Sequence, residues 1–250
     1  MRVVAILPAR FGSRRFPGKP LAVIAGKPLI QWVFETACRV PELAEVYVAT
    51  DDHRIAACIQ AVGGQAVMTS SQHPSGSDRL AEAARLLGLA PEDIVVNIQG
   101  DQIIFPLELI SALVGSLITD EDAAMATAVR PFSDPLAAAD PNVVKAVFDH
   151  RRYALYFSRA AIPHYRDQEG QPVYYKHIGI YVYRQTFLQQ FVALPPGTWE
   201  AAEKLEQLRA LEFGYKIKVE ETTAETLEVD TPEEARRAEL YLRGREKKNG

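Results

Sequence analysis

The amino-acid sequence predicts an α/β protein with a doubly wound, mostly parallel sheet and a smaller, more antiparallel insertion. Short apolar runs alternate with longer helical patterns through the first 130 residues, which is the order that builds a parallel sheet with right-handed crossovers. Residues 3–7 form a continuous apolar run, as expected of a strand buried on both faces. From Pro131 the rhythm changes to consecutive strand-like runs, which favours an antiparallel region there.

The first part of the chain contains the elements of the parallel sheet. Pro28 suits the first turn of a helix, because its missing N–H would have no helical partner there. Helices are expected to begin near Pro28, Asp52, Asp78 and Pro106. Strands are expected at residues 3–7, 45–50, 66–68, 94–98 and 124–129.

Residues 131–200 are predicted to form the insertion, with a protruding polar stretch at 164–172. The chain then returns to the main body and ends in a helix that begins at about Thr231. We expect a single domain over residues 1–243, followed by a flexible charged tail over 244–250. The other expected elements are strands at 143–148, 153–158, 174–183 and 216–220 and helices at 185–192 and 201–213.

The composition limits the classes of function. With 48% apolar and 24% charged residues, the 250-residue chain is of the ordinary globular type. Its 28 basic and 32 acidic residues give a net charge of -4, which argues against a nucleic-acid partner. The apolar run at the N-terminus is too short for a secretory signal or a membrane span. We therefore expect no membrane insertion. Cys38 and Cys58 have neither metal-ligand nor disulfide spacing, which suits the reducing cytoplasm, so we expect a cytoplasmic protein.

The loop after the first strand combines small residues with basic ones. It sets Arg10, Arg14 and Lys19 beside Gly12 and Ser13. Small residues let backbone N–H groups approach a phosphate, while the cations supply charge; a plain basic surface loop is the alternative. The loop has neither the dinucleotide-binding glycine fingerprint nor the Walker phosphate-binding loop. This disfavours a dehydrogenase and a Walker-type ATPase.

Two acidic residues are candidate metal ligands. Asp101 follows the strand at 94–98, at the sheet edge where open α/β sheets bind ligands. Asp230 precedes the last helix. Mg²⁺ takes one or two carboxylates together with substrate phosphates and water, so the pair could share one ion. The alternatives are a turn cap at Asp101 and a helix cap at Asp230 or Thr231.

Five motifs together resemble those of the CMP-sugar synthetase family. The similarity runs from Val3 to about Ala238, with the motifs in the order that the family has them. Segments at 154–163, 176–181 and 205–209 are more similar to the branch that activates 3-deoxy-manno-octulosonate (Kdo) than to the sialic-acid branch. The five motifs are PARFGSRRFPGKPL from residue 8, ATD from 49, HPSGSDR from 73, NIQGD from 97 and VDTPE from 229.

The resemblance implies transfer of CMP from CTP to Kdo with release of pyrophosphate, for lipopolysaccharide synthesis. It also implies Mg²⁺ as cofactor and a homodimer built partly by the insertion. The catalytic residues implied are Arg10, Lys19 and Asp101, with Asp101 and Asp230 holding the metal. Nucleotide contacts are implied for Arg10, Ser13, Arg14, Lys19, Ser77, Asp78 and Arg79. Sugar contacts are implied for Gln99, Arg159, His177, Tyr181, Glu206 and Gln207.

Several of these roles have structural alternatives. Asp78 could simply cap the helix expected to begin there. Without the resemblance, His177 and Tyr181 are better explained as structural, because a spacing of four on a strand puts them on one face. A nucleotide sensor without turnover is the alternative of another class. Such a sensor would have little use for Arg10, Lys19, Asp101 and Asp230 together.

Two positions depart from the family pattern. Gln102 replaces the glutamate that usually follows Gly-Asp, and Val182 stands where glycine is frequent. The change at Gln102 alters local charge and turn shape, and Val182 could alter the wall of the sugar pocket. Either departure could accompany a different substrate, such as 8-amino-Kdo or another acidic sugar, or could be neutral.

Overall fold

The chain folds into two compact units in the computed structural model, which describes residues 1–12, 16–167 and 172–249. The first unit consists of Met1–Glu108 and Glu225–Gly250, and the second of Leu109–Ala224. The stretch expected as an insertion, residues 131–200, lies inside the second unit. In the part of the chain that is described, no helix has the length and apolar character needed to cross a membrane.

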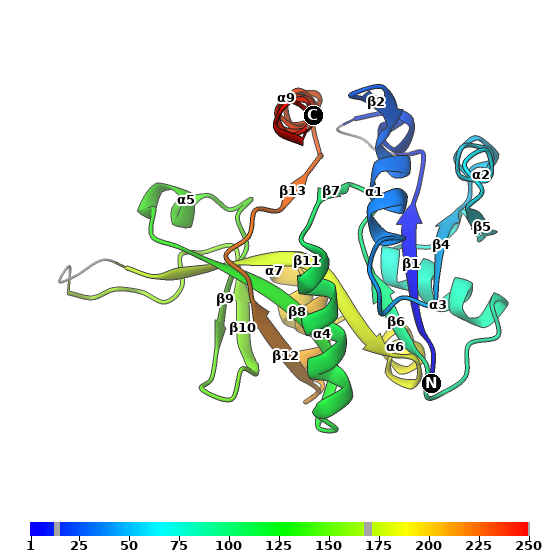
Figure 1. Ribbon diagram of the computed structural model, residues 1–250. Coiled ribbons are helices and arrows are strands. Elements are labelled where there is room, and N and C mark those ends of the chain that lie inside the picture. The colour runs from blue at the N-terminus through cyan, green and yellow to red at the C-terminus, as the bar shows by residue number, and fades with distance from the viewer. Residues whose placement is uncertain (13–15, 168–171, 250) are drawn as a thin grey trace. The chain divides into compact units, whose positions relative to one another are not determined.

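The first unit is built on parallel strands in the order β6, β1, β4, β5 (Figure 1). The run from Val4 to Leu7 is fully buried, as its uninterrupted apolar character predicts. Val95 and Val96 of the neighbouring strand are equally inaccessible. The bounds are β1 (Val3–Ala9), β4 (Glu45–Thr50), β5 (Gln65–Met68) and β6 (Ile94–Asn97).

Helices α1 (Leu29–Ala37), α2 (His53–Gln60) and α3 (Gly76–Leu86) follow strands of this sheet (Figure 1). Asp52 caps α2, since its carboxylate accepts from the Arg54 N–H at 2.9 Å. Helix α3 begins at Gly76, close to the expected start near Asp78, but the alternative that Asp78 caps this helix is wrong. Ser75 is the cap: its hydroxyl accepts from the Asp78 N–H at 3.2 Å and donates to the Asp78 carboxylate at 2.6 Å.

Short elements that the sequence did not predict complete the first unit. The pairing of β7 with β13 is antiparallel and brings the C-terminal segment beside the loop that follows β6. The final helix, α9, begins at Pro232 as expected and continues to Asn249, into the residues 244–250 that were expected to form a flexible tail. The bounds are η1 (Lys19–Leu21), β2 (Val23–Ile24), β3 (Lys27–Pro28), β7 (Gln102–Ile104), β13 (Leu227–Glu228) and α9 (Pro232–Asn249).

The second unit is more antiparallel, as predicted. Its strands lie in the order β10, β9, β11, β8, β12, and of these pairs only β8 with β12 is parallel. Together the two units confirm the predicted α/β class, a mostly parallel sheet with a smaller antiparallel part. The bounds are α4 (Leu107–Thr119), β8 (Ala123–Phe132), α5 (Pro135–Ala139), β9 (Lys145–Phe148), β10 (Ala154–Ser158), β11 (Tyr174–Arg184), α6 (Gln185–Ala193), α7 (Thr198–Glu203), α8 (Gln207–Glu212) and β12 (Lys216–Glu221).

The helix expected at residues 201–213 is in fact two helices. Lys204 has a φ of 54°, in the left-handed region, and this ends α7. The chain then begins α8 at Gln207, with Glu206 at its N-cap position. The break therefore places Glu206 and Gln207 at the start of a helix rather than in its middle.

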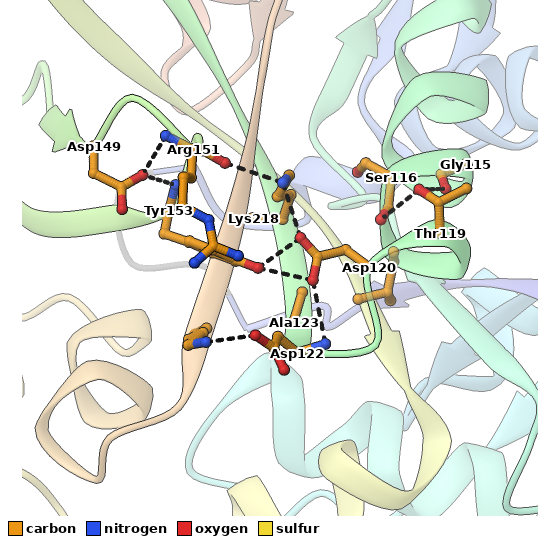
Figure 2. Close-up of polar contacts among 12 residues, drawn as sticks. Gly115, Ser116, Thr119, Asp120, Asp122, Ala123, Asp149, Arg151, Tyr153 and Lys218 are labelled. Carbon is orange, nitrogen blue, oxygen red and sulfur yellow. Dashed lines mark hydrogen bonds and ion pairs between the residues drawn. The ribbon is translucent and has the colours of Figure 1, made fainter.

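Asp120 connects three segments of the second unit (Figure 2). Its carboxylate accepts from the Tyr153 hydroxyl at 2.7 and 2.8 Å and from Lys218 Nζ at 2.9 Å. These bonds tie the turn after α4 to the β9–β10 hairpin and to β12. Burial alone would raise the pKa of Asp120, but the hydrogen bonds from Lys218 and Tyr153 outweigh it and lower the pKa to about 2.

Replacing Asp120 with asparagine should lower the free energy of unfolding at pH 7 by about 1–2 kcal/mol, through loss of charge-assisted hydrogen bonds. Because the folded-state pKa lies below the ordinary value of 3.8, this stabilisation is present above about pH 4 and is lost as the pH falls towards 2. Urea unfolding of both proteins between pH 2 and 7 measures the difference, which should close at low pH. Asp122→Asn, at a carboxylate that is 60% exposed, is the control with little expected effect. A difference that stays constant with pH would contradict the assignment.

Candidate active site

A cavity of about 650 Å³ lies in the first unit, at the carboxyl ends of its parallel strands. Pro8 and Ala9 at the end of β1 line it, together with Gln99–Asp101 after β6. Residues 73–76, which lead into α3, form another part of the wall. Of the residues predicted to contact nucleotide or metal, the lining includes Arg10, Lys19, Arg79, Asp101 and Asp230.

The ammonium group of Lys19 lies between two carboxylates. Lys19 Nζ is 2.6 Å from Asp101 Oδ2 and 2.9 Å from Asp230 Oδ1. The Lys19 side chain is 13% exposed, and the two carboxylates are 27% and 31% exposed. Burial would lower the pKa of Lys19, but Asp101 and Asp230 outweigh it and raise the pKa. The group is thus held as a cation in a partly solvent-accessible site.

Glycines allow two of these side chains to reach the cavity. Gly18 has a φ of 70°, in the left-handed region, and precedes η1, which carries Lys19. At Gly100 a Cβ atom would lie 2.8 Å from the Pro8 carbonyl oxygen. Glycine therefore lets the loop that carries Asp101 pack directly on the end of β1.

The backbone of the C-terminal segment places Asp230. The Val229 N–H donates to the Asp101 carbonyl oxygen at 3.0 Å, next to the β7–β13 pair. Thr231 caps α9: its hydroxyl accepts from the Glu234 N–H at 3.2 Å, and the Glu234 carboxylate accepts from the Thr231 N–H at 3.0 Å. Of the two caps considered for this helix, the structure therefore shows Thr231. The Asp230 carboxylate faces Lys19 instead.

Asp101 and Asp230 fit the chemistry of a divalent cation. Both carboxylates come within hydrogen-bond distance of one positive group, so they converge on a common point. Two carboxylates match what Mg²⁺ takes from a protein when substrate phosphates and water supply the other oxygens. Among the described residues, no group of three or more His, Cys, Asp or Glu side chains is gathered that could hold a metal.

The residues predicted to contact the nucleotide have different surroundings. Arg10 is exposed at the cavity, and the described part of the chain offers it no ion pair. Ser13 and Arg14 lie outside the described residues. Ser77 is 3% exposed and Asp78 bonds to the helix cap, and neither lines the cavity.

Arg79 is a buried guanidinium that joins three elements. It is 4% exposed, with Nη1 2.6 Å from Thr69 Oγ1 and Nη2 3.2 Å from Asp51 Oδ2. These partners follow β5 and β4, so Arg79 fixes the strand ends around the cavity that it also lines. The ATD motif that ends at Asp51 supplies one of these partners.

His73 is a cavity residue that the sequence reasoning did not select. Its Nε2 lies 2.5 Å from Glu82 Oε2, and the Glu82 carboxylate also accepts from the Ser70 N–H at 2.8 Å. The hydrogen bond from His73 lowers the pKa of Glu82 despite the opposing effect of burial. The first position of the HPSGSDR motif was the available signal.

The residues predicted to bind the sugar lie in the second unit, apart from Gln99 in the first. Arg159 Nε donates to the Glu203 carbonyl oxygen at 2.7 Å, and Nη1 donates to the Pro141 carbonyl oxygen at 2.8 Å. Gln207 is 5% exposed, and its Nε2 is a buried donor for which the described residues provide no hydrogen-bond partner. An amide in this state is suited to a polar ligand.

His177 and Tyr181 are brought together by an irregularity in β11. Their ring centroids are 5.4 Å apart, whereas four residues of a regular strand span about 13 Å at about 3.3 Å each. The register against β8 shifts between Ile178 and Tyr181, so that Ile178 pairs with Ala128 and Tyr181 pairs with Thr127. The bulge, rather than simple alternation, accounts for the contact.

The two departures from the family pattern have different structural settings. Val182 is fully buried and follows Tyr181 on the strand, so it points to the opposite face and packs in the core. Gln102 Nε2 donates to the carbonyl oxygens of Ile104 at 3.1 Å and Leu227 at 3.3 Å. Gln102 therefore adds a side-chain bond between β7 and β13, the strand that leads to Asp230.

Comparison with known proteins agrees with this fold. The family model described as cytidylyltransferase matches residues 4–217. A protein of Syntrophus aciditrophicus (strain SB) named 3-deoxy-manno-octulosonate cytidylyltransferase is 50% identical over 244 residues, covering 98% of each chain. A protein of Shewanella pealeana (strain ATCC 700345 / ANG-SQ1) named 8-amino-3,8-dideoxy-manno-octulosonate cytidylyltransferase is 51% identical over 245 residues, covering 97% of this chain and 99% of the relative.

A solved structure is similar over the whole chain. It is that of a CMP:2-keto-3-deoxy-manno-octonic acid synthetase complexed with CTP, with a TM-score of 0.92 and 40% identity. The match covers 98% of this chain and all of that one. With the fold and the cavity, these likenesses define the protein as a nucleotidyltransferase. The chain belongs to the cytidylyltransferase family.

Replacing Gln102 with methionine keeps the length of the side chain but removes both N–H donors. The free energy of unfolding should fall by about 1–3 kcal/mol, because a buried carbonyl group and a partly buried one each lose a partner. Urea unfolding measures this. Gln102→Glu is a second test variant, because a glutamate carboxyl group that faces two carbonyl oxygens can donate a hydrogen bond only while it is protonated. Its folded-state pKa should be raised, so its stability should fall as the pH rises through that value. If the glutamate variant were as stable as wild type at every pH, Gln102 would not make these bonds.

Proposed function

We propose that the protein transfers CMP from CTP to the anomeric hydroxyl of Kdo, giving CMP-Kdo and pyrophosphate for lipopolysaccharide synthesis. The observation that carries this proposal is the meeting of Lys19, Asp101 and Asp230 in a cavity beside the exposed Arg10. The names of the relatives at about 50% identity support the sugar, and the CTP complex of the similar structure supports the nucleotide.

In this reaction the anomeric oxygen of the sugar attacks the α-phosphorus of CTP. The bond from that phosphorus to the oxygen bridging to the β-phosphate breaks, pyrophosphate leaves, and the hydroxyl proton is released. Negative charge gathers on the phosphates, so fixed cations lower the barrier. Of the basic residues that line the cavity, Arg10 and Lys19 would bind the triphosphate and align it, whereas Arg79 is held by Thr69 and Asp51.

Asp101 and Asp230 are the proposed ligands of Mg²⁺. When bound, the ion would supply positive charge next to the phosphates. The same carboxylates hold Lys19 in the structure, so they also orient the lysine that would face the triphosphate. Arg10, Lys19 and Asp101 are accordingly the proposed catalytic residues.

The second unit is proposed to provide most of the sugar contacts. Arg159 is the guanidinium suited to the sugar carboxylate, while His177, Tyr181, Glu206 and Gln207 provide polar groups for its hydroxyls. An 8-amino analogue of Kdo is a second candidate acceptor. The 51% identical relative named for that sugar is the observation that favours it.

Pyrophosphate release in the presence of CTP and Mg²⁺ tests the proposal, with Kdo, 8-amino-Kdo and N-acetylneuraminate as parallel acceptors. Release should depend on Kdo and stop when EDTA removes the metal. Asp101→Asn should lower kcat by about 100-fold or more, because the proposed Mg²⁺ site and Lys19, whose positive charges stabilise the transition state, lose a carboxylate that holds them. Asp122→Asn, outside the cavity lining, is the matched control. If the wild-type protein bound CTP but released no pyrophosphate with any of the three sugars, a nucleotide sensor would be favoured over an enzyme.

We also propose a homodimer formed partly by residues 131–200, and a cytoplasmic location. Large apolar side chains are exposed in this stretch: Leu136 is 83% exposed, Leu155 is 61% and Trp199 is 44%. A second copy of the chain that covered these side chains would remove their apolar surface from water, which is favourable. The free thiols of Cys38 and Cys58 suit a reducing compartment.

Leu155→Glu should convert the dimer to a monomer, because a charge would be buried at the interface without a partner. Sedimentation velocity at micromolar concentration measures the change in mass. Leu240→Glu replaces another exposed leucine, on α9 of the first unit, and should leave the dimer intact. A monomeric wild-type protein would contradict the proposed dimer.

A further inference from the structure

Thr127 of β8 occupies the inside of the bulge in β11. Its side chain is fully buried, and Oγ1 lies 2.9 Å from the Ile180 carbonyl oxygen and 3.2 Å from the Ile178 carbonyl oxygen. The same oxygen is 3.0 Å from His177 Nε2. One hydroxyl therefore faces two carbonyl groups of the bulge and one ring nitrogen of the histidine beside it.

The proton count at this hydroxyl decides the direction of each bond. A threonine hydroxyl has one proton and two lone pairs, and carbonyl oxygens only accept. If the proton pointed at the histidine, the oxygen lone pairs would face the Ile178 and Ile180 oxygens without a proton between them. The Thr127 proton therefore goes to a carbonyl oxygen, and Oγ1 accepts from His177 Nε2. Nε2 must then carry a hydrogen.

His177 is a neutral imidazole in this setting. Burial, with a smaller effect of Lys176, lowers the pKa of His177 to about 3. A neutral ring has one N–H, so a hydrogen on Nε2 leaves Nδ1 as an acceptor. Within the described residues, Nδ1 has no hydrogen-bond partner.

Neighbouring groups hold the ring as well. The ring of Phe157 meets it edge-on with centroids 5.0 Å apart, and Tyr181 lies 5.4 Å away. The His177 backbone N–H donates to the Val144 carbonyl oxygen at 2.8 Å. Packing and the main chain thus fix where the imidazole lies. Thr127 fixes which of its nitrogens carries the proton.

We infer that Thr127 is a positioning residue that keeps His177 in the Nε2–H form, so that Nδ1 accepts a hydrogen bond from the acceptor sugar. The group recognised at this nitrogen is a donor, either a hydroxyl or an ammonium, and never a carboxylate oxygen. The contact with sugar rests on the proposed function, whereas the tautomer of His177 does not. A nitrogen of this kind accepts from the 8-hydroxyl of Kdo and from an 8-amino group alike, so it does not by itself separate those two sugars.

The tautomer can be measured without any substrate, by ¹⁵N NMR of the full-length protein with labelled histidines. His177→Gln assigns the signals of this ring among the five histidines. Wild type at pH 7 should show a protonated Nε2 and an unprotonated Nδ1. Thr127→Val, which keeps the shape but removes the hydroxyl, should lose this fixed pattern, and Thr127→Ser should retain it. A hydrogen on Nδ1 in wild type, or an unchanged pattern in Thr127→Val, would overturn the inference.

Kinetics test the consequence for the sugar. Thr127→Val should raise KM for Kdo by about tenfold, the effect of one hydrogen bond, while KM for CTP changes by less than about twofold. Thr127→Ser should restore the wild-type KM for Kdo. Equal losses towards CTP and Kdo would show a general structural defect and would overturn the positioning role. If wild type released no pyrophosphate with any sugar acid, the proposed function would fail, yet the nitrogen spectra would still decide the tautomer.

Discussion

The ion pairs from Lys19 to Asp101 and Asp230 connect parts of the chain that are far apart in the sequence. Lys19 precedes Asp101 by 82 residues and Asp230 by 211. Each acidic group needs its own support: Gly100 lets one loop pack on the end of β1, and the β7–β13 pair holds the other segment beside it. Two carboxylates this close would repel each other without a cation between them. The lysine therefore stabilises the arrangement that a metal ion and a triphosphate would use.

Uncharged polar groups dominate around His177 in the second unit. Its neutral imidazole, the Thr127 hydroxyl and the carbonyl groups of the β11 bulge are held by hydrogen bonds rather than by net charge. Neutral donors and acceptors recognise a polyhydroxylated ligand by direction, and they cost less to bury than ions do. The immediate surroundings of His177 thus differ from the cavity around Lys19, where charged groups dominate.

Those parts of the fold and of the candidate site that depend on local sequence could be predicted. The apolar run at residues 3–7 predicted a buried parallel strand. Asp101 was selected because it follows a strand at the ligand-binding edge of the sheet, and Asp230, which precedes the last helix, was selected as a second carboxylate for the same metal. The break at Lys204 could not be seen, because the lysine adopts a left-handed conformation without the usual glycine signal. The cap of α3 could not be decided from the sequence, because serine and aspartate are both good N-cap residues. The backbone geometry shows that Ser75, and not Asp78, is the cap. The role of Thr127 could not be predicted for a different reason: in the sequence, a threonine within an apolar strand cannot be distinguished from any other β-branched core residue.

The position of Thr127 bears on how this protein could discriminate between sugars. Val182, which stands where the family often has glycine, is buried on the face of β11 opposite to Tyr181. Its side chain therefore does not change the face of the strand that carries Tyr181. Gln102 acts on the position of Asp230, which belongs to the charged cavity and not to the sugar contacts. Neither departure adds or removes a charge among the proposed sugar residues of the second unit. The acceptor nitrogen of His177 can bind either a hydroxyl or an ammonium group. Selection between these two groups would therefore have to come from residues such as Glu206, whose carboxylate binds a cation more strongly than a neutral donor.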